Sequence, residues 1–221
     1  MSSVRSFLRD GRGAGAAEFA LILPLFLLFL LGIIDAGRFA WAFNQAEKAT
    51  QIGARWAVVT DVIPGGAAAT GLRNYNFVSG SIPQGGSVNS TAFPGIYCQT
   101  NGSTASSPLT CTCKSTCGFS VATSDTTAQT AWTNLINRLQ DIYPGLGPQT
   151  VRIDYDWSGL GYAGDPNGPD VAPLVTVSLR SEPANQMRFQ PMTLMLFGGA
   201  LGIPSASSTL TMEDGRGTDS N

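Results

Sequence analysis

The longest apolar run of the chain lies near its N-terminus and extends from Phe19 to Ile34, interrupted only by one proline and one glycine. A hydrocarbon core about 30 Å thick requires roughly 20 mostly apolar residues in a helix. Residues 14–34 supply 21 residues, with Glu18 as the only charged side chain among them. The pattern therefore predicts a transmembrane helix over residues 14–36.

Apolar residues recur at steps of three or four beyond this run, as they do on one face of a helix. They are Phe39, Phe43, Ala46, Ala49, Ile52 (or Gly53), Trp56 and Val59. Polar residues fill the opposite face, and Pro64 with the two glycines after it ends the pattern. We expect one helix from about residue 15 to residue 61, with residues 37–61 outside the membrane and packed on a soluble domain.

Later stretches alternate apolar and polar residues with a period of two, as half-buried strands do. The strands expected from this period are residues 151–157 and 174–180, and residues 207–212 are expected to form a last strand. Ser124 or Asp125 is placed to cap a further helix, which ends near Ile142 because a proline and a glycine follow. Residues 62–124 are rich in Gly, Ser, Thr and Pro, and this composition predicts loops with short strands.

A second apolar run, residues 194–203, contains ten residues, which is too few to cross a bilayer. We expect it to be a buried segment. The predicted fold is thus α+β: a long N-terminal helix, with a membrane-spanning first half, packs on a small antiparallel-sheet head domain with one further helix. The head domain comprises residues 62–221, and its C-terminal tail is expected to be flexible.

The length of 221 residues allows one membrane segment and one modest domain. The net charge of −2 argues against a nucleic-acid partner, since phosphate binding requires a basic face. Residues 1–13 hold three arginines and one aspartate, a net charge of +2, so the remainder carries −4. A basic end before an apolar run predicts a cytoplasmic N-terminus, with the rest of the chain outside.

The chain contains no histidine, which excludes Ser-His-Asp and Cys-His catalysis and removes the commonest metal ligand. Carboxylates remain candidates for catalysis at Asp154, Asp156, Asp165 and Asp170, and the first two share one face of a predicted strand. That face also fits a solvated surface. Asp165 and Asp170 occur in a loop that lacks the ligand order of a calcium-binding EF-hand, so we expect a solvated turn. We predict no catalytic residues, no metal and no cofactor.

All four cysteines fall within the loop-rich region, at Cys98, Cys111, Cys113 and Cys117. An even number of clustered cysteines outside the membrane predicts two disulfides. Zinc is the alternative, but the spacings differ from the usual two-residue gap. We expect Cys111 and Cys113 each to pair with Cys98 or Cys117, and the connectivity stays open.

Small residues precede the apolar run, in the order Gly13-Ala14-Gly15-Ala16-Ala17-Glu18-Phe19. This stretch resembles the prepilin-type processing site. Together with Ala20-Leu21, Pro24 and Gly37-Arg38, it is similar to the start of TadE-like proteins, the minor pilins (pseudopilins) of tight-adherence (Flp, type IVb) pilus systems. The alternative for these residues is an ordinary signal anchor with a glutamate at the membrane interface.

The resemblance implies that a prepilin peptidase cleaves between Gly13 and Ala14, so that residues 1–13 are a leader. It also implies that Glu18, the fifth residue after the cut, aids insertion or pairs with the new amino terminus of a neighbouring subunit. The Glu-Phe pair and the large head domain of this chain favour a minor subunit over the major pilin. Major Flp pilins are short, and many carry Glu-Tyr instead.

The leading hypothesis is a non-enzymatic minor pseudopilin that acts in pilus assembly through helix packing and subunit contacts. The partners implied are a prepilin peptidase, other pilins and pseudopilins, the inner-membrane assembly platform, and membrane lipid. The implied location is the bacterial inner membrane, with one span, a periplasmic or extracellular head and incorporation in a pilus. The alternative is a single-pass, membrane-anchored binding or adhesion module, or a hydrolase, unrelated to pili.

Overall fold

The computed structural model describes residues 14–195, 198–213 and 215. The chain forms two units: residues up to 42 join residues 189–201, and residues 43–188 join those from 202 onward. The fold is α+β, as predicted, with a long N-terminal helix, a five-stranded antiparallel sheet and further helices. The predicted leader and most of the predicted flexible tail lie outside the described residues.

Helix α2 runs from Ala14 to Ala57 and contains 44 residues, which corresponds to about 66 Å at 1.5 Å per residue. It ends four residues before the predicted position near residue 61. Beyond its last residue, the hydroxyl of Thr60 donates a hydrogen bond to the carbonyl of Trp56 (3.0 Å) and so satisfies one of the exposed carbonyls at the helix end.

The C-terminal part of α2 belongs to the second unit and packs through small side chains. Ala46, Ala49, Gly53 and Ala57 are buried at steps of three or four residues. A Cβ atom on Gly53 would come within 3.4 Å of Leu139 and Val177 side-chain atoms. The larger apolar residues of the predicted face are only half-buried, so small residues form the centre of this contact and allow the helix to approach closely.

The sheet has the strand order β2-β1-β3-β4-β7, and every neighbouring pair is antiparallel. The strands are β1 (Ile96–Gln99), β2 (Thr110–Cys113), β3 (Val151–Asp156), β4 (Leu174–Leu179) and β7 (Ser207–Thr211). The two strands predicted from the period of two and the predicted last strand are therefore confirmed, each ending one residue earlier than predicted. The two N-terminal strands, β1 and β2, come from the loop-rich region.

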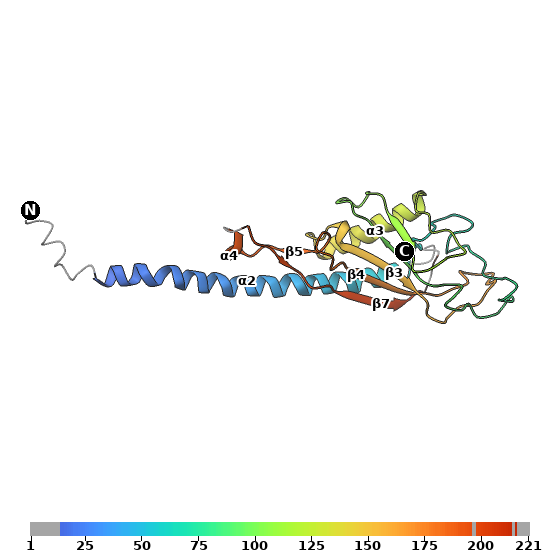
Figure 1. Ribbon diagram of the computed structural model, residues 1–221, viewed down its shortest axis with the longest axis horizontal. Coiled ribbons are helices and arrows are strands. Elements are labelled where there is room, and N and C mark those ends of the chain that lie inside the picture. The colour runs from blue at the N-terminus through green and yellow to red at the C-terminus, as the bar shows by residue number, and fades with distance from the viewer. Residues whose placement is uncertain (1–13, 196–197, 214, 216–221) are drawn as a thin grey trace, which may run out of the picture. The chain divides into compact units, whose positions relative to one another are not determined.

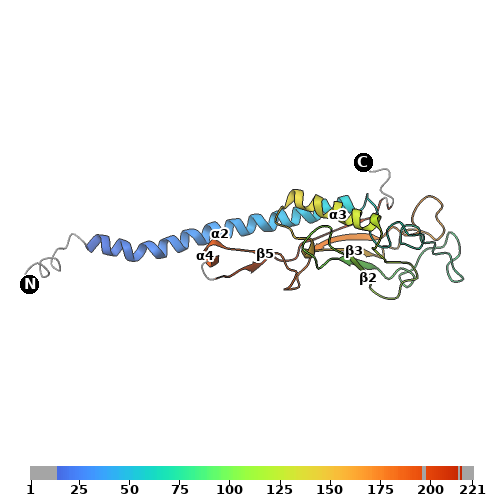
Figure 2. The same ribbon diagram turned by 90° about the horizontal axis from the view of Figure 1, so that it is seen from above.

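One face of the sheet forms the core of the second unit. Its buried side chains are Ile96, Cys98, Val151, Ile153, Tyr155, Val175, Val177 and Leu179. Helix α3 (Thr126–Ile142) contributes Trp132, Leu135, Ile136 and Leu139 to this core. Figure 2 shows α3 beside the C-terminal part of α2, with the strands below both. The opposite face of the sheet is polar.

Asp125 joins the start of α3 to the turn that follows α2. Its carboxylate accepts a hydrogen bond from the backbone N–H of Ala128, which confirms the predicted cap, and another from Ala67 (both 2.8 Å). Gly65 and Gly66 form the turn with φ values of +79° and +52°, which glycine adopts without steric cost. A side chain on Gly66 would collide with the Asp125 carboxylate.

Two disulfides are present, as predicted, and the structure supplies their connectivity. Cys98 on β1 is bonded to Cys111, its direct partner in the register with β2. Cys113, the last residue of β2, is bonded to Cys117, four residues further on. One disulfide therefore ties two strands together and the other closes a short loop.

The loop-rich region has an aromatic core of its own. Tyr75, Phe77, Phe93 and Phe119 lie with neighbouring ring centroids 4.8 to 6.4 Å apart. The three phenylalanines are buried. Edge-to-face and stacked ring pairs add to the free energy gained from burial. The cluster therefore packs together loops of residues 62–124 that the composition of this region does not show to be in contact.

The prediction that residues 194–203 are a buried segment is wrong. They fall mainly in a hairpin made of β5 (Arg188–Phe189), the single turn α4 (Met192–Met195) and β6 (Leu201–Gly202). Met195 is 68% exposed and Leu201 is 47% exposed, whereas Ile203 is buried. Residues 189–201 join the apolar part of α2 in the first unit, so they are not available to fill the core beneath the sheet.

Candidate functional site at the N-terminal helix

Large apolar side chains cover the first part of α2 and face outward. Phe19, Leu21, Leu25 and Phe29 are between 64% and 80% exposed. The core helix of a soluble protein would bury such residues, whereas none of the most apolar window of α2 is buried within the described structure. Helix α2 is long and apolar enough to span a membrane.

The residues of the predicted pilin motif lie at the start of this helix. Ala14 is the first residue of α2, and Gly13, the other side of the predicted cleavage site, lies outside the described residues. Glu18 is exposed and has no hydrogen bond or ion pair with any described side chain. Phe19 is exposed beside it, and Pro24 lies inside the helix, which continues through it.

A second carboxylate, Asp35, lies at the opposite end of the apolar run and is buried. Its Oδ1 accepts a hydrogen bond from the backbone N–H of Met192 (2.8 Å), and its Oδ2 accepts from the N–H and the hydroxyl of Thr193 (2.9 and 2.8 Å). Arg38, one turn further along α2, donates to Oδ1 at 3.1 Å. Each oxygen of the Asp35 carboxylate therefore accepts two hydrogen bonds from protein donors.

Aromatic contacts continue this attachment one turn beyond Asp35. The rings of Phe39 on α2 and Phe189 on β5 meet edge to face, with centroids 5.6 Å apart. The guanidinium of Arg38 lies 5.3 Å from the centre of the Phe189 ring, within the range of a cation–π interaction. The hairpin is thus held to α2 by charge, by backbone hydrogen bonds and by ring packing.

Sequence reasoning did not single out Asp35. The available signal is its position: it is the only acidic residue between Glu18 and Glu47, and it ends the apolar run with Arg38 three residues later. That spacing places the two side chains on one face of a helix. The pairing with Met192 and Thr193, more than 150 residues away, has no counterpart in the local pattern.

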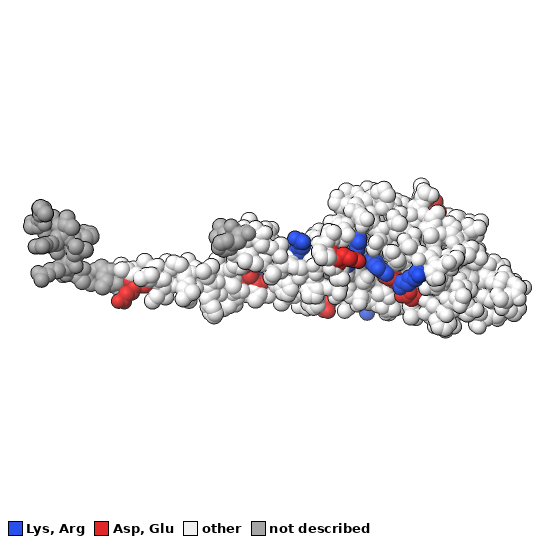
Figure 3. Space-filling view, in the orientation of Figure 1, with Lys and Arg blue, Asp and Glu red and all other residues white. Residues whose placement is uncertain are grey.

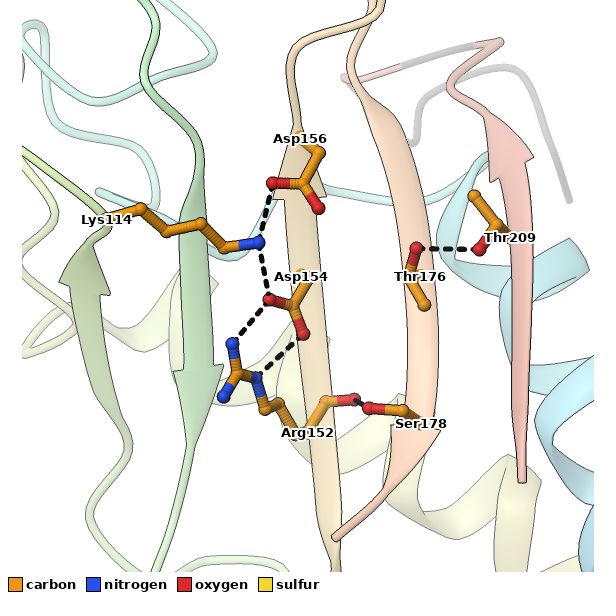
Figure 4. A network of polar contacts seen from close by, with 7 residues as sticks. All are labelled: Lys114, Arg152, Asp154, Asp156, Thr176, Ser178 and Thr209. Carbon is orange, nitrogen blue, oxygen red and sulfur yellow. Dashed lines mark hydrogen bonds and ion pairs between the residues drawn. The ribbon is translucent and has the colours of Figure 1, made fainter. Parts of the chain in front are cut away.

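Asp154 and Asp156, two of the carboxylates considered for catalysis, lie on the polar face of the sheet. Basic side chains form ion pairs with both of them there (Figure 4). Arg152 binds both oxygens of Asp154 (2.7 and 2.8 Å). Lys114 lies 2.9 Å from Asp154 and 2.6 Å from Asp156 and so bridges them. Asp154 is buried rather than solvated, because two cations and the ring of Tyr97, 4.1 Å from the Arg152 guanidinium, close over it.

The charges of this network shift the pKa values of its cations. Partial burial lowers the pKa of Lys114, but hydrogen bonds and charge from Asp156 and Asp154 outweigh it, so the pKa is raised. The hydrogen bonds from Arg152 to Asp154 likewise raise the pKa of Arg152 against partial burial. Figure 3 shows acidic and basic side chains next to one another over this region. The network is a set of ion pairs without an unpaired acid.

Asp170 is also buried rather than part of a solvated turn. It accepts hydrogen bonds from the backbone N–H groups of Phe77 (2.6 Å) and Asp165 (3.0 Å). These contacts attach the loop around residues 165–170 to the aromatic core. Among the described residues, no three acidic or cysteine side chains gather as metal ligands do.

A comparison with protein families finds one match in the part of the chain that contains α2. The family model described as TadE-like protein matches residues 13–55, which end two residues before the helix does. No curated protein and no solved structure matches the chain. The resemblance predicted from Glu18, Phe19 and Pro24 is therefore confirmed: residues 13–55 are similar to the TadE-like family.

Proposed function

We propose that this chain is a membrane-anchored minor pseudopilin that takes part in assembling a tight-adherence pilus. The TadE-like family suggests a role in such assembly. The observation that carries the proposal is the exposed apolar helix, which begins at Ala14 with Glu18 in its second turn. A helix of this kind requires lipid or other helices as its surroundings.

In this proposal a prepilin peptidase removes residues 1–13 and leaves the apolar helix in place. Glu18 becomes the fifth residue of the mature chain and meets the new ammonium group of a neighbouring subunit. Attraction between these charges is much larger in a low dielectric than in water. The exposed, unpaired state of Glu18 among the described residues supports this role, since a carboxylate at membrane depth is costly without a partner.

Bundling with other pilin helices is the second step of the proposed mechanism. Gly15, Gly32 and Gly37 have open space where a side chain would lie. Small residues at such positions allow helix backbones to approach closely in a membrane. The proposed partners are therefore other pilins or pseudopilins and the inner-membrane assembly platform, with lipid around the isolated helix.

The alternative functions receive less support from the geometry. A hydrolase requires a carboxylate that can donate or accept a proton, whereas Asp154 and Asp156 are paired with Arg152 and Lys114. An anchored binding or adhesion module is compatible with the same anchor. It differs from a pseudopilin in having no need for the leader to be removed.

The mature amino terminus tests the proposal. We expect co-expression with a prepilin peptidase to remove residues 1–13, as measured by intact-protein mass spectrometry, and Gly13→Ala to block this cleavage. Gly11→Ala is the matched control, because it changes a nearby glycine outside the predicted processing motif. A chain that still begins at Met1 in the presence of an active peptidase contradicts the proposal.

Pilus formation is the second readout. A strain that lacks this protein should lose surface pili in electron micrographs and regain them with the wild-type chain. The Gly13→Ala variant should fail to restore them, whereas Gly11→Ala, which changes only the removed leader, should succeed. Normal piliation in the deletion strain would favour the anchored binding module instead.

A further inference from the structure

The hairpin of β5, α4 and β6 presents an apolar surface beside α2. Met192, Met195 and Leu201 are 48%, 68% and 47% exposed. The sequence has no charged residue between Arg188 and Glu213. Soluble proteins seldom leave several large apolar side chains exposed together without a functional reason, so the tip of this hairpin requires an apolar environment.

The contacts of the hairpin fix its level along α2. Phe189 packs on Phe39, and three residues later Met192 hydrogen-bonds to Asp35. The chain therefore runs from β5 toward the N-terminal end of α2 as it enters α4. Figures 1 and 2 agree, because in both views α4 lies beside α2 on the side of β5 nearer to that end.

This level coincides with the end of the apolar stretch. A span of about 20 residues that begins near Ala14 ends close to Asp35. A bilayer around that span then has its outer surface at the level of α4. Asp35 receives backbone N–H donors from α4 there, and Arg38, one turn further along α2, is paired with it.

We propose that the tip of the hairpin, through Met192, Met195 and Leu201, inserts into the outer interfacial layer of the lipid bilayer beside α2. The inference rests on the membrane insertion of α2 in the proposed function. Lipid is the occupant because it surrounds this level of α2 before any assembly. Asp35 is a positioning residue that holds α4 at that depth. The head is thus attached to the membrane at a second point.

The depth of a nitroxide at Met195→Cys tests this inference in the full-length protein. The four native cysteines are paired in disulfides, so the label reacts with the introduced thiol. Nanodiscs of phosphatidylcholine and phosphatidylglycerol that hold one copy each provide the membrane. Collision with oxygen reports lipid, and collision with a water-soluble nickel complex reports solvent. Leu25→Cys marks the proposed span, and Ser207→Cys, exposed on β7, marks water.

We expect the oxygen-to-nickel ratio at Met195→Cys to be severalfold higher than at Ser207→Cys and to approach that at Leu25→Cys. A ratio equal to that at Ser207→Cys, with Leu25→Cys in lipid, overturns the inference and leaves the membrane anchor intact. Access to neither reagent at Met195→Cys also overturns it, because protein then covers the tip. Solvent exposure at Leu25→Cys overturns the membrane anchor and the inference with it.

A second variant tests the positioning role of Asp35. Asp35→Asn retains one acceptor but loses the carboxylate oxygen that Thr193 requires. We expect the ratio at Met195→Cys to fall toward the solvent value while that at Leu25→Cys stays unchanged. Glu47→Gln, an exposed carboxylate on the same helix, is the matched control. An unchanged ratio at Met195→Cys in Asp35→Asn contradicts this role.

Discussion

At the scale of the residue, two carboxylates mark the ends of the apolar run in different environments. Glu18 is exposed and has no partner among the described residues. Asp35 is buried and accepts bonds from Met192, Thr193 and Arg38. An acidic group within or beside a membrane span is usually paired. The partner of Asp35 comes from this chain, and we propose that the partner of Glu18 comes from another.

The free energy of unfolding of the head should fall at alkaline pH because two of its side chains, Tyr155 and Lys114, titrate there. Burial raises the pKa of Tyr155. The pKa of Lys114 is raised because its contacts with Asp156 and Asp154 outweigh its partial burial. Both groups therefore hold their protons in the folded state after the unfolded chain has lost them. Their contribution is complete below about pH 10, the ordinary value for tyrosine, and declines above it. The buried Tyr155 contributes a slope of at most about 1.4 kcal/mol per pH unit, and the partly exposed Lys114 contributes less because solvent screens its charge.

Guanidinium unfolding of the full chain in detergent micelles, followed by tryptophan fluorescence, measures this decline. Between pH 9 and 11, the free energy of unfolding should fall by about 0.5 to 1.4 kcal/mol less in Tyr155→Phe than in the wild type. Tyr143→Phe, at a half-buried position, controls for the loss of a hydroxyl. Equal pH profiles for wild type and Tyr155→Phe would exclude a role for this group.

At the scale of the element, one helix serves two surroundings. Its first part exposes large apolar side chains such as Leu21 and Leu25. Its last part buries Ala46, Ala49 and Gly53 against the second unit. Large side chains suit contact with lipid, whereas small ones allow close contact with α3 and β4. The change in residue size along α2 therefore matches the change in what each part contacts.

The two disulfides should differ in their effect on stability. In the chain-entropy account, a cross-link stabilises more when it closes a longer loop. The Cys98–Cys111 separation is 13 residues and the Cys113–Cys117 separation is 4. Replacing both members of the first pair with alanine should cost about 3 kcal/mol, and doing so for the second about 2 kcal/mol.

Denaturant unfolding of the two double variants, under the conditions used for the wild type, compares these costs. Each double variant serves as the control for the other, because both remove two sulfur atoms from the region of β2. A larger loss for the Cys113–Cys117 pair would show that loop length does not determine the effect here.

At the scale of the whole molecule, charge and redox chemistry agree on one orientation. Residues 1–13 carry a net charge of +2, and basic segments beside a membrane span stay in the cytoplasm. The disulfides lie after the helix, and such bonds persist in oxidising compartments. We therefore expect the head on the side of the membrane opposite to the leader.

Labelling with a membrane-impermeant maleimide tests this orientation in intact spheroplasts. Ser207→Cys should react without lysis. Ser3→Cys, placed in the Gly13→Ala background so that the leader is retained, should react only after lysis. The reverse pattern would place the head in the cytoplasm and would contradict both the orientation and the pilus proposal.

Much of the fold could be predicted because it depends on local patterns. The period of two gave β3 and β4 nearly to the residue, and the cap at Asp125 gave the start of α3. The strands β1 and β2 were only loosely foreseen, because short strands in a Gly- and Ser-rich region depend on their partners. Residues 194–203 were mispredicted as buried, since hydrophobicity alone does not tell which partner covers a segment.

Some features of the candidate site could likewise be predicted from local sequence, whereas others depend on distant contacts. Glu18, Phe19 and Pro24 lie within seven residues of one another, so the sequence alone shows the resemblance that they carry. Asp35 acquires its role only through α4, and Asp154 acquires its burial only through Arg152 and Lys114. Neither relation follows from spacing along the chain.

The sequence by itself determined the apolar helix, the resemblance to the TadE-like family, the alternating strands and the presence of paired cysteines. Each of these is a property of neighbouring residues, because helix and strand periods and the reading of a short motif extend over a few positions. Tertiary structure alone decided which cysteines join, which aspartates are buried and where the second apolar run lies. Those outcomes depend on contacts between distant segments, whose free energies are set by the packing of the folded chain.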